Sequence, residues 1–283
     1  ERLVGSEMCI RDSNLTAANT NRQLGITTNG LQKSTEKLSS GYKINRAADD
    51  AAGLSISEKM RNQIRGLNKA SDNAQDGISL VQTAEGALNE VHSMLQRMSE
   101  LAVQAANGTN ATTDRTALND EVQQLKTEIQ RVGSTTQFNK MNILDGGFSA
   151  GTKKALQVGA NANQTISIAI SALKSVVGSS LIGALKISTA TNAQSAITTV
   201  QSSIEKLSTL RSKLGAVQNR LEHTVANLDN ISENTQSAES RIRDTDMAEE
   251  MVQYSKNNIL QQAGQSMLAQ ANQANQGVLS LLQ

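Results

Sequence analysis

Residues 60–102 read MRNQIRGLNKASDNAQDGISLVQTAEGALNEVHSMLQRMSELA and carry an apolar residue at every seventh position. The members of this row are Met60, Leu67, Ala74, Val81, Leu88, Leu95 and Ala102. A second row lies at intermediate positions and contains Ile64, Ile78, Val91 and Met98. Spacings of three and four place such side chains along one stripe of an α-helix, and a sustained repeat of seven is typical of helices that supercoil around partners. The stretch therefore predicts a long helix in a coiled coil.

Two other segments repeat the pattern. The longer one contains Val200, Leu207, Leu214, Leu221, Leu228, Thr235 and Ile242, and the shorter one contains Leu118, Val122, Leu125, Ile129 and Val132. A helix over 60–102 would extend roughly 65 Å at 1.5 Å per residue, whereas a compact chain of this length has a radius of gyration of only about 19 Å. The sequence therefore predicts an elongated rod.

Composition supports helices and excludes several classes of protein. The chain has 283 residues, a formal charge of +1, no Pro, no Trp and 1% aromatic residues. Pro interrupts helices, so its absence favours long ones. A near-neutral chain lacks the positive field that nucleic-acid binding requires, and no run of 18 apolar residues predicts a membrane span. The single Cys9 can form neither an internal disulfide nor a cysteine-based metal site.

The middle of the chain, residues 137–190, loses the helical repeat and gains Gly. Ile166, Ile168 and Ile170 alternate with small or polar residues, which is the period of a strand with one buried face. We expect a small β-hairpin region where the rod turns back.

The two ends carry narrower apolar stripes among Asn, Gln, Ser and Thr. Leu24, Leu31 and Leu38 are seven residues apart, and a C-terminal stripe runs through Ile259, Met267, Val278 and Leu281. Narrow stripes rarely sustain an isolated helix. The ends are therefore either frayed tails or helices that fold only with neighbours, and the seven-residue spacing favours the second interpretation.

Catalytic and metal-binding patterns are missing from the sequence. His92 and His223 form no HExxH or HxxxH pair, and the chain has no phosphate-binding glycine loop. The adjacent pairs Asp49-Asp50 and Glu249-Glu250 point in different directions on a helix, so we interpret them as helix-start or surface charges. We expect no enzyme activity, no cofactor and no metal.

The motifs at the two ends resemble bacterial flagellin, the filament subunit. LSSG at 38–41 is followed by DDAAG at 49–53, and LQQAGQSMLAQANQ at 260–273 precedes VLSLL at 278–282. The similarity extends through QFNKMNILDG at 137–146 and covers residues 14–283. It implies a structural subunit that polymerises into the flagellar filament for swimming motility.

The resemblance also implies a division of the chain. Residues 14–45 and 246–283 would be inner-domain helices that pair in the polymer, 46–136 and 191–245 would be rod helices, and 137–190 would be the β cap. The fold class is then mainly α: an antiparallel coiled-coil rod with a small β-hairpin cap and no large outer domain. Residues 1–13 match nothing in the family, and we interpret them as a tag, a scar or a misread start.

Partners follow from the resemblance in the same way. They are further copies of the chain, an export chaperone, and the cap and junction proteins of an extracellular filament, reached through the flagellar secretion apparatus without a signal peptide. Flagellins are also detected by an animal Toll-like receptor. The matching positions here are Gln96, Arg97, Leu101, Gln104 and Glu121. Their spacing predicts one helix face with Leu101 as an apolar anchor and Glu121 on the adjacent helix; Ser99 stands where receptor-active relatives often have Arg.

Two other functions share some of these features. A hook–filament junction (hook-associated) protein has the same terminal architecture, and a secreted coiled-coil adhesin would also be long and helical. The VLSLL ending and the segment QVGANANQ at 157–164 favour the filament subunit.

Overall fold

The computed structural model describes residues 15–149, 153–178 and 185–281, with side chains described as far as residue 273. Its elements are α2 (Leu15–Ser40), α3 (Ala51–Ala106), α4 (Thr112–Thr135), β1 (Gln137–Phe138), β2 (Met141–Asn142), β3 (Lys154–Gln157), β4 (Thr165–Ile168), α5 (Leu173–Val177), α7 (Ala190–Arg243) and α8 (Met247–Leu281). The segment 1–13 and its Cys9, interpreted above as foreign to the family, lie outside the described residues.

Tertiary contacts divide the chain into two units. The first unit comprises residues 1–61 and 235–283, and the second comprises residues 62–234. The division falls inside α3 and α7 rather than in loops, so each of these helices contributes to both units. The fold is mainly helical, as the heptad rows predict.

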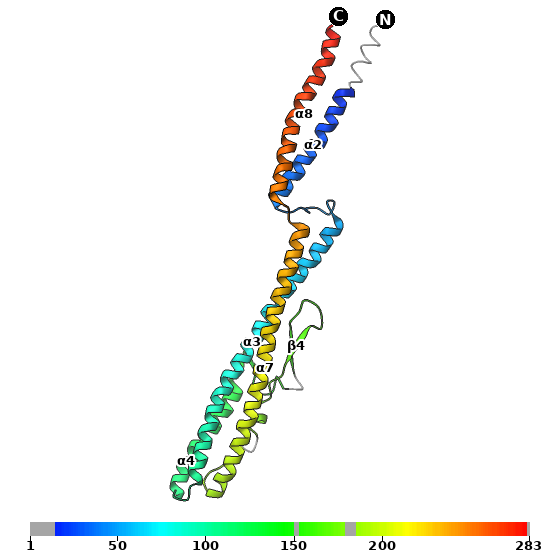
Figure 1. The fold of residues 1–283 in the computed structure, drawn as a ribbon. Helices are drawn as coiled ribbons and strands as arrows, with labels where there is room; N and C mark the ends of the chain where they lie inside the picture. Colours follow the sequence, from blue (N-terminus) through cyan, green and yellow to red (C-terminus); the bar gives the residue numbers. More distant parts are fainter. Residues whose placement is uncertain (1–14, 150–152, 179–184, 282–283) are drawn as a thin grey trace. The chain divides into compact units, whose positions relative to one another are not determined.

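In the first unit, α2 and α8 lie side by side and antiparallel (Figure 1). Lys37 near the end of α2 reaches Glu250 near the start of α8, with 3.3 Å between Nζ and Oε2. Further along the pair, the side chain of Leu24 lies over Gly264, where an added Cβ would be 3.3 Å from Leu24 Cδ1. The contact surface is therefore narrow and largely polar.

The second unit contains the hydrophobic core, built on antiparallel α3 and α7. Ser71 Oγ donates to Asp229 Oδ1 across the two helices at 3.1 Å, and Arg211 pairs with Glu85 further along the same two helices. The heptad residues that face this seam are at most 5% exposed: Leu67, Ala74, Val81, Leu88, Leu95, Ala102, Val200, Leu207, Leu214, Leu221 and Leu228. Burial of each Leu or Val stabilises the fold by about 1.5–3 kcal/mol, so the predicted rows form the core.

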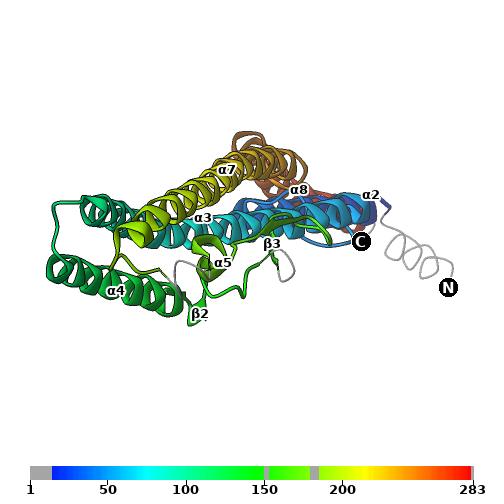
Figure 2. The ribbon, with the colours of Figure 1, turned by 90° about the horizontal axis from the view of Figure 1, so that it is seen from below.

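Helix α4 runs beside α3 in the same unit (Figure 2). Its residues Val122 and Ile129 are fully buried, and Arg115 Nε donates to the Ala105 carbonyl of α3 at 2.9 Å. Between residues 91 and 105, α3 therefore packs against two helices instead of one, and its buried face is correspondingly wide.

The β region consists of two separate hairpins. Strand β3 pairs with β4 in the register Lys154↔Ile168 to Gln157↔Thr165, and Ile166, Ile168 and Ile170 are buried as their alternation predicts. The β1–β2 hairpin turns at Asn139 and Lys140, whose φ angles of 48° and 62° are typical of a two-residue type I′ turn. This hairpin and the short helix α5 were not expected individually.

Among the residues that the structure describes, no helix combines the length and the hydropathy needed to cross a bilayer.

Candidate functional site

The LSSG and DDAAG motifs build the turn that ends α2 and begins α3. Gly41 adopts a φ of +75° and donates its backbone N–H to the Lys37 carbonyl at 2.8 Å, a left-handed helix ending that favours glycine. Asp50 caps α3 by accepting the Gly53 N–H at 2.9 Å. A Cβ at Gly53 would lie 2.8 Å from Ile44 Cδ1, so a larger residue would force the buried Ile44 side chain to shift. These family motifs therefore encode the geometry of a turn.

Asp49 stabilises the same turn by accepting hydrogen bonds from backbone N–H groups that precede it. Its Oδ2 accepts the backbone N–H of Arg46 at 3.0 Å and that of Asn45 at 3.3 Å. The hydrogen bond from Arg46 is the main cause that lowers the pKa of the Asp49 carboxyl, because it stabilises the charged form. The interpretation of Asp49-Asp50 as helix-start charges agrees with these contacts.

The two halves of the predicted polymerisation stripe are in different environments. Leu24, Leu31 and Leu38 of α2 are half-buried. Ile259 and Met267 of α8 are 66% and 58% exposed. The side chains of Val278 and Leu281 lie outside those described. The structure therefore brings the α2 leucines toward α8 but leaves Ile259 and Met267 more than half exposed, with Met267 bordering a groove beside Leu24.

A different face of α8 contacts α2. Glu250 pairs with Lys37, Asn257 lies 3.2 Å from the position of a Cβ on Gly30, and Gly264 lies under Leu24. Glu250, Asn257 and Gly264 are seven residues apart, so they form a heptad row of polar and small residues. A search for apolar residues misses this row; the seven-residue spacing is the signal that could have found it.

Exposed apolar side chains gather on α8. Its members that are at least 46% exposed are Met247, Met251, Val252, Ile259, Leu260 and Met267. Within 247–273, where side chains are described, no residue of α8 is fully buried. At about 3.6 residues per turn, Val252, Ile259, Leu260 and Met267 share one side of the helix and form its exposed apolar face. Such a face is typical of a surface that another protein covers.

The predicted receptor-like patch lies on α3 and α4, with one correction. Arg97 donates to Glu121 of α4 at 2.9 Å and to Glu100 at 3.1 Å, and the bond to Glu121 is the main cause that raises the pKa of the Arg97 guanidinium. Gln96 and Gln104 are exposed. Leu101, however, is 0% exposed, so its predicted role as a surface anchor is wrong: α3 is flanked by both α4 and α7 there, and the side chain belongs to the core.

A groove borders this patch and offers a different apolar contact. It is lined by Gln96, Ser99, Glu100, Val103 and Gln104 of α3 and by Ile204 of α7. Val103 is 57% exposed, in contrast to the buried Leu101.

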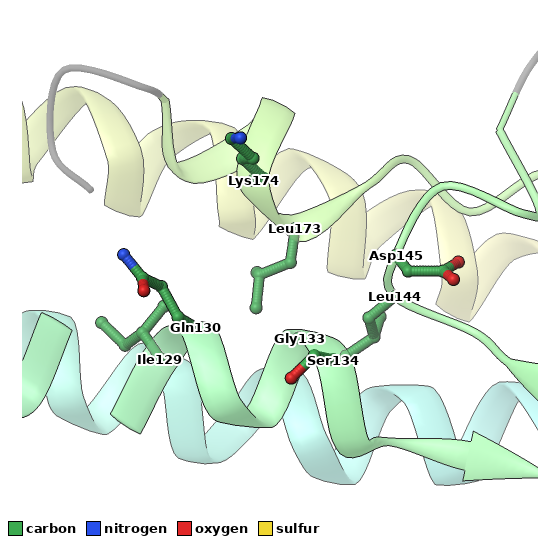
Figure 3. A pocket seen from close by; sticks show the side chains of 8 residues that line it. All are labelled: Ile129, Gln130, Gly133, Ser134, Leu144, Asp145, Leu173 and Lys174. Atoms are coloured by element: carbon green, nitrogen blue, oxygen red, sulfur yellow. The ribbon is translucent and has the colours of Figure 1, made fainter. Parts of the chain in front are cut away.

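A cavity of about 340 Å³ separates α4 from α5 and the loop after β2. Figure 3 shows Leu173 pointing from α5 toward α4, whereas Lys174 and Asp145 point away from the space between them. The remaining lining residues are Ile129, Gln130, Gly133, Ser134 and Leu144. No arrangement of acid, base and nucleophile converges in this cavity.

The two histidines have no catalytic setting. His92 Nε2 lies 3.1 Å from Gln96 Nε2 on the same helix, and His223 is an exposed residue of α7. Within the described part of the chain, no three His, Cys, Asp or Glu side chains gather as metal ligands would.

Long antiparallel helices, a turn built by the LSSG and DDAAG motifs and an exposed apolar face on α8 are typical of helical proteins that assemble with other chains. Comparison with known proteins agrees. Residues 12–149 match the bacterial flagellin N-terminal helical region, and residues 197–282 match the bacterial flagellin C-terminal helical region. Together these regions account for most of the chain.

Individual relatives are similar over their full length. The chain is 57% identical to a flagellin of Halalkalibacterium halodurans over 273 residues, which span 96% of this chain and 99% of that one. It is 49% identical to the flagellin of Bacillus subtilis over 298 aligned residues, covering 95% and 98% of the two chains. The crystal structure of Bacillus cereus flagellin is 33% identical, with a TM-score of 0.49 over 56% of this chain and 88% of that one.

The chain belongs to the bacterial flagellin family. It is a structural, non-enzymatic subunit of the extracellular flagellar filament and serves motility. This identity at near-complete coverage excludes the adhesin interpretation and favours the filament subunit over the junction protein.

Proposed function

We propose that the α2–α8 pair is the segment through which this flagellin polymerises, and that the exposed face of α8 is covered by neighbouring subunits. The observation that carries the proposal is the contrast between the units. The second unit buries its heptad rows, whereas the described part of α8 buries none of its residues and exposes Ile259 and Met267 by more than half.

The energetics favour such an assembly. Full burial of a large apolar side chain contributes about 1.5–3 kcal/mol, so the six exposed residues of α8 could contribute on the order of 10 kcal/mol before the costs of association. The contact between α2 and α8 alone is polar and narrow. Copies of the chain supply the missing apolar surface, which is coupled folding and binding.

The proposed division of the chain follows from this. Residues 14–45 and 246–283 act as the inner helices, 46–136 and 191–245 act as the rod, and 137–190 acts as the cap. The turn between Gly41 and Asp50 and the turn between α7 and α8 separate inner helices from rod helices, which supports this division.

The exposed surface of α8 also offers a binding site for proteins other than further copies of the chain. An exposed apolar helix face needs protection in a cell, so we propose that an export chaperone binds α8 and that the filament cap and junction proteins contact the same terminal pair. Membership of the family supports the proposal that the chain is exported through the flagellar secretion apparatus.

A second proposal concerns the receptor-like patch. Gln96, Arg97, Gln104 and Glu121 form a polar surface that an animal Toll-like receptor could contact, and Val103 replaces Leu101 as the apolar residue that is accessible there. The exposed charges of Arg97 and Glu121 are the feature that favours this surface.

The assembly proposal is tested by placing a charge on the exposed face. We expect Ile259→Asp and Met267→Asp to abolish seeded filament growth in electron micrographs, because burial of an unpaired charge is costly. Gln265→Asp is the matched control: it adds the same charge to an exposed position of α8 without removing an apolar side chain. Normal filaments from both Asp variants of the apolar face would refute the proposal.

A further inference from the structure

Two guanidinium groups approach the ring of Tyr42 at the turn after α2. Arg243 Cζ, at the end of α7, is 4.7 Å from the ring centroid, and Arg61 Cζ, on α3, is 5.9 Å from it. Both distances are within the range of cation–π attraction. We propose that Tyr42, through its cation–π contacts with Arg243 and Arg61, is a positioning residue that sets the register in which α2 and α8 pair.

Backbone hydrogen bonds join the two turns at the same point. Lys43 donates its N–H to the Arg243 carbonyl at 2.6 Å, and Thr245 donates its N–H to the Gly41 carbonyl at 3.0 Å. Tyr42 and Asp244 are therefore directly opposite each other in an isolated antiparallel bridge. We call this bridge and the two arginines around Tyr42 the Tyr42 clasp.

Ion pairs keep the two arginines in place. Arg243 Nη1 is 3.2 Å from Glu58 Oε1, and Arg61 Nε is 3.5 Å from Glu239 Oε1. The side chain of Arg243 is only 14% exposed, so its guanidinium has little freedom to leave the ring. The clasp thus ties the first turns of α3 and the last turns of α7 to the connection that begins α2–α8 pairing.

The register of α2 and α8 continues from the clasp without a shift. Moving away from the Tyr42–Asp244 bridge, the facing pairs are Lys37 with Glu250, Gly30 with Asn257 and Leu24 with Gly264. Each step is about one heptad on both helices, which is the repeat of an antiparallel coiled coil.

The helices themselves specify this register weakly. The row of Glu250, Asn257 and Gly264 is polar or small, and Leu260 and Met267 beside it border an open groove with Leu24 rather than a buried seam. A shift by seven residues would therefore replace Asn257 by Gly264 beneath the same part of α2 without exposing a large apolar core. Coiled coils normally fix register with distinctive buried residues; the described part of α8 has none, and α2 buries only the small Ser34. The clasp supplies the fixed point that the seam lacks, and its consequence for filament growth rests on the proposed function of α2 and α8.

Hydrogen exchange in the full-length monomer tests the clasp. We expect Tyr42→Leu to accelerate amide exchange in α2 and α8 by about tenfold or more, with exchange in residues 62–234 unchanged, because only the terminal pair loses its fixed register. Tyr42→Phe, which keeps the aromatic face, should stay within about twofold of the unsubstituted chain. Arg243→Leu should accelerate exchange in α2 and α8 as Tyr42→Leu does. Arg241→Leu, at an exposed position on the same helix turn, should leave this exchange unchanged. Unchanged exchange in Tyr42→Leu would overturn the proposal.

An engineered disulfide across the Tyr42–Asp244 bridge tests the same proposal if Tyr42→Leu unfolds the first unit. Tyr42 and Asp244 form a non-hydrogen-bonded antiparallel pair, for which Cα atoms lie about 4.5 Å apart, within the range that a disulfide spans. In a Cys9→Ser background, we expect oxidised Tyr42→Cys/Asp244→Cys to restore slow exchange in α2 and α8, and reduction to remove it. Fast exchange in the oxidised protein would contradict register setting by this joint. Failure of filaments to form despite slow exchange would count against the assembly proposal and leave the clasp standing.

Discussion

The ammonium group of Lys126 on α4 donates a hydrogen bond to the carbonyl of Leu185 at 3.3 Å, inside the second unit. Gln123, one turn earlier, donates to the same carbonyl at 3.0 Å, and Asn119 accepts the Ile187 N–H at 3.1 Å. Side chains of a helix thus satisfy the backbone of the extended segment that leads into α7. Lys126 is 6% exposed, and its ammonium donates to Gln123 Oε1 and the Leu185 carbonyl rather than to a carboxylate, so neutral oxygens alone offset the desolvation of its charge.

Replacement of Lys126 by Met is expected to leave the free energy of unfolding unchanged or to raise it by about 1 kcal/mol. Met fills the same volume without a buried charge, and Gln123 still satisfies the Leu185 carbonyl. Urea unfolding followed by circular dichroism measures this change. A loss of stability well beyond about 1 kcal/mol would show that the ammonium hydrogen bonds outweigh its desolvation.

The same residue predicts a pH dependence. Burial, and secondarily the charge of Lys186, lower the pKa of Lys126 below its ordinary value of 10.5. Between the lowered pKa and 10.5 the unfolded chain binds a proton that the folded chain has released, so the free energy of unfolding rises with pH across that window. The rise should be smaller in Lys126→Met, whereas Lys186→Met, at an exposed position, should retain most of it.

Acid should weaken the turn between α2 and α3. The pKa of Asp49 lies below its ordinary value of 3.8, so its charged form stabilises the fold above that pH and the contribution is lost as the pH falls through the lowered pKa. Nuclear magnetic resonance should show the Asp49 carboxyl titrating below 3.8, with the Asn45 and Arg46 amides shifting in parallel. Asp49→Asn should remove this titration; amide shifts that persist in the variant would assign them to another group.

Two glycines of α3 should respond oppositely to alanine. A Cβ on Gly66 would lie 2.9 Å from Ala160 Cβ and 3.2 Å from its backbone Cα, whereas nothing lies within 4 Å of a Cβ on Gly86. Gly86→Ala should raise the free energy of unfolding by about 1 kcal/mol through helix propensity. Gly66→Ala gains the same helix propensity, but its methyl group crowds the 159–164 loop at a cost of about 1–3 kcal/mol. Its net effect on the free energy of unfolding should therefore be destabilising. Equal stabilisation by both would mean that the loop moves freely.

Substitutions in the receptor-like patch should distinguish residues that contact a receptor from residues that stabilise the core. Arg97→Ala should weaken binding to a Toll-like receptor ectodomain while leaving thermal unfolding nearly unchanged, since its ion pairs are exposed. Arg131→Ala, which removes another exposed arginine paired on its own helix, is the control. Leu101→Ala should instead lower the free energy of unfolding by about 2–5 kcal/mol, because it opens a cavity in the core. Binding that survives Arg97→Ala and Val103→Asp together would retire the receptor proposal.

Sequence patterns predict the parts of this molecule that bury apolar rows. Leu88, Leu95, Leu207 and Leu214 recur at seven residues and lie in the core, and the alternation around Ile168 predicts a strand with one buried face. The pattern fails where burial depends on a third element. Leu101 shares its apparent helix face with Arg97, but α4 and α7 together cover a wider arc of α3 than a single seam would.

Contacts without an apolar signature are also invisible to such patterns. Glu250, Asn257 and Gly264 of α8 contact α2, whereas Ile259 and Met267 of the apolar stripe stay more than half exposed, so the stripe predicts an apolar face and misses the residues that pair the helices. Helix α5 has five residues, too few to display a period. The Tyr42 clasp depends on residues about 200 positions apart in the chain, which no local spacing relates.

The accessibility of one methionine in monomer and polymer tests the central claim most directly. Met267 Sδ belongs to a side chain that is 58% exposed, whereas Met98 is 0% exposed in the core. Brief treatment with hydrogen peroxide, read by mass spectrometry, should oxidise Met267 readily in the monomer and at least about tenfold more slowly in filaments, with Met98 protected in both. Equal oxidation of Met267 in monomer and filament would contradict the account, because the exposed face of α8 would then not be the surface that polymerisation buries.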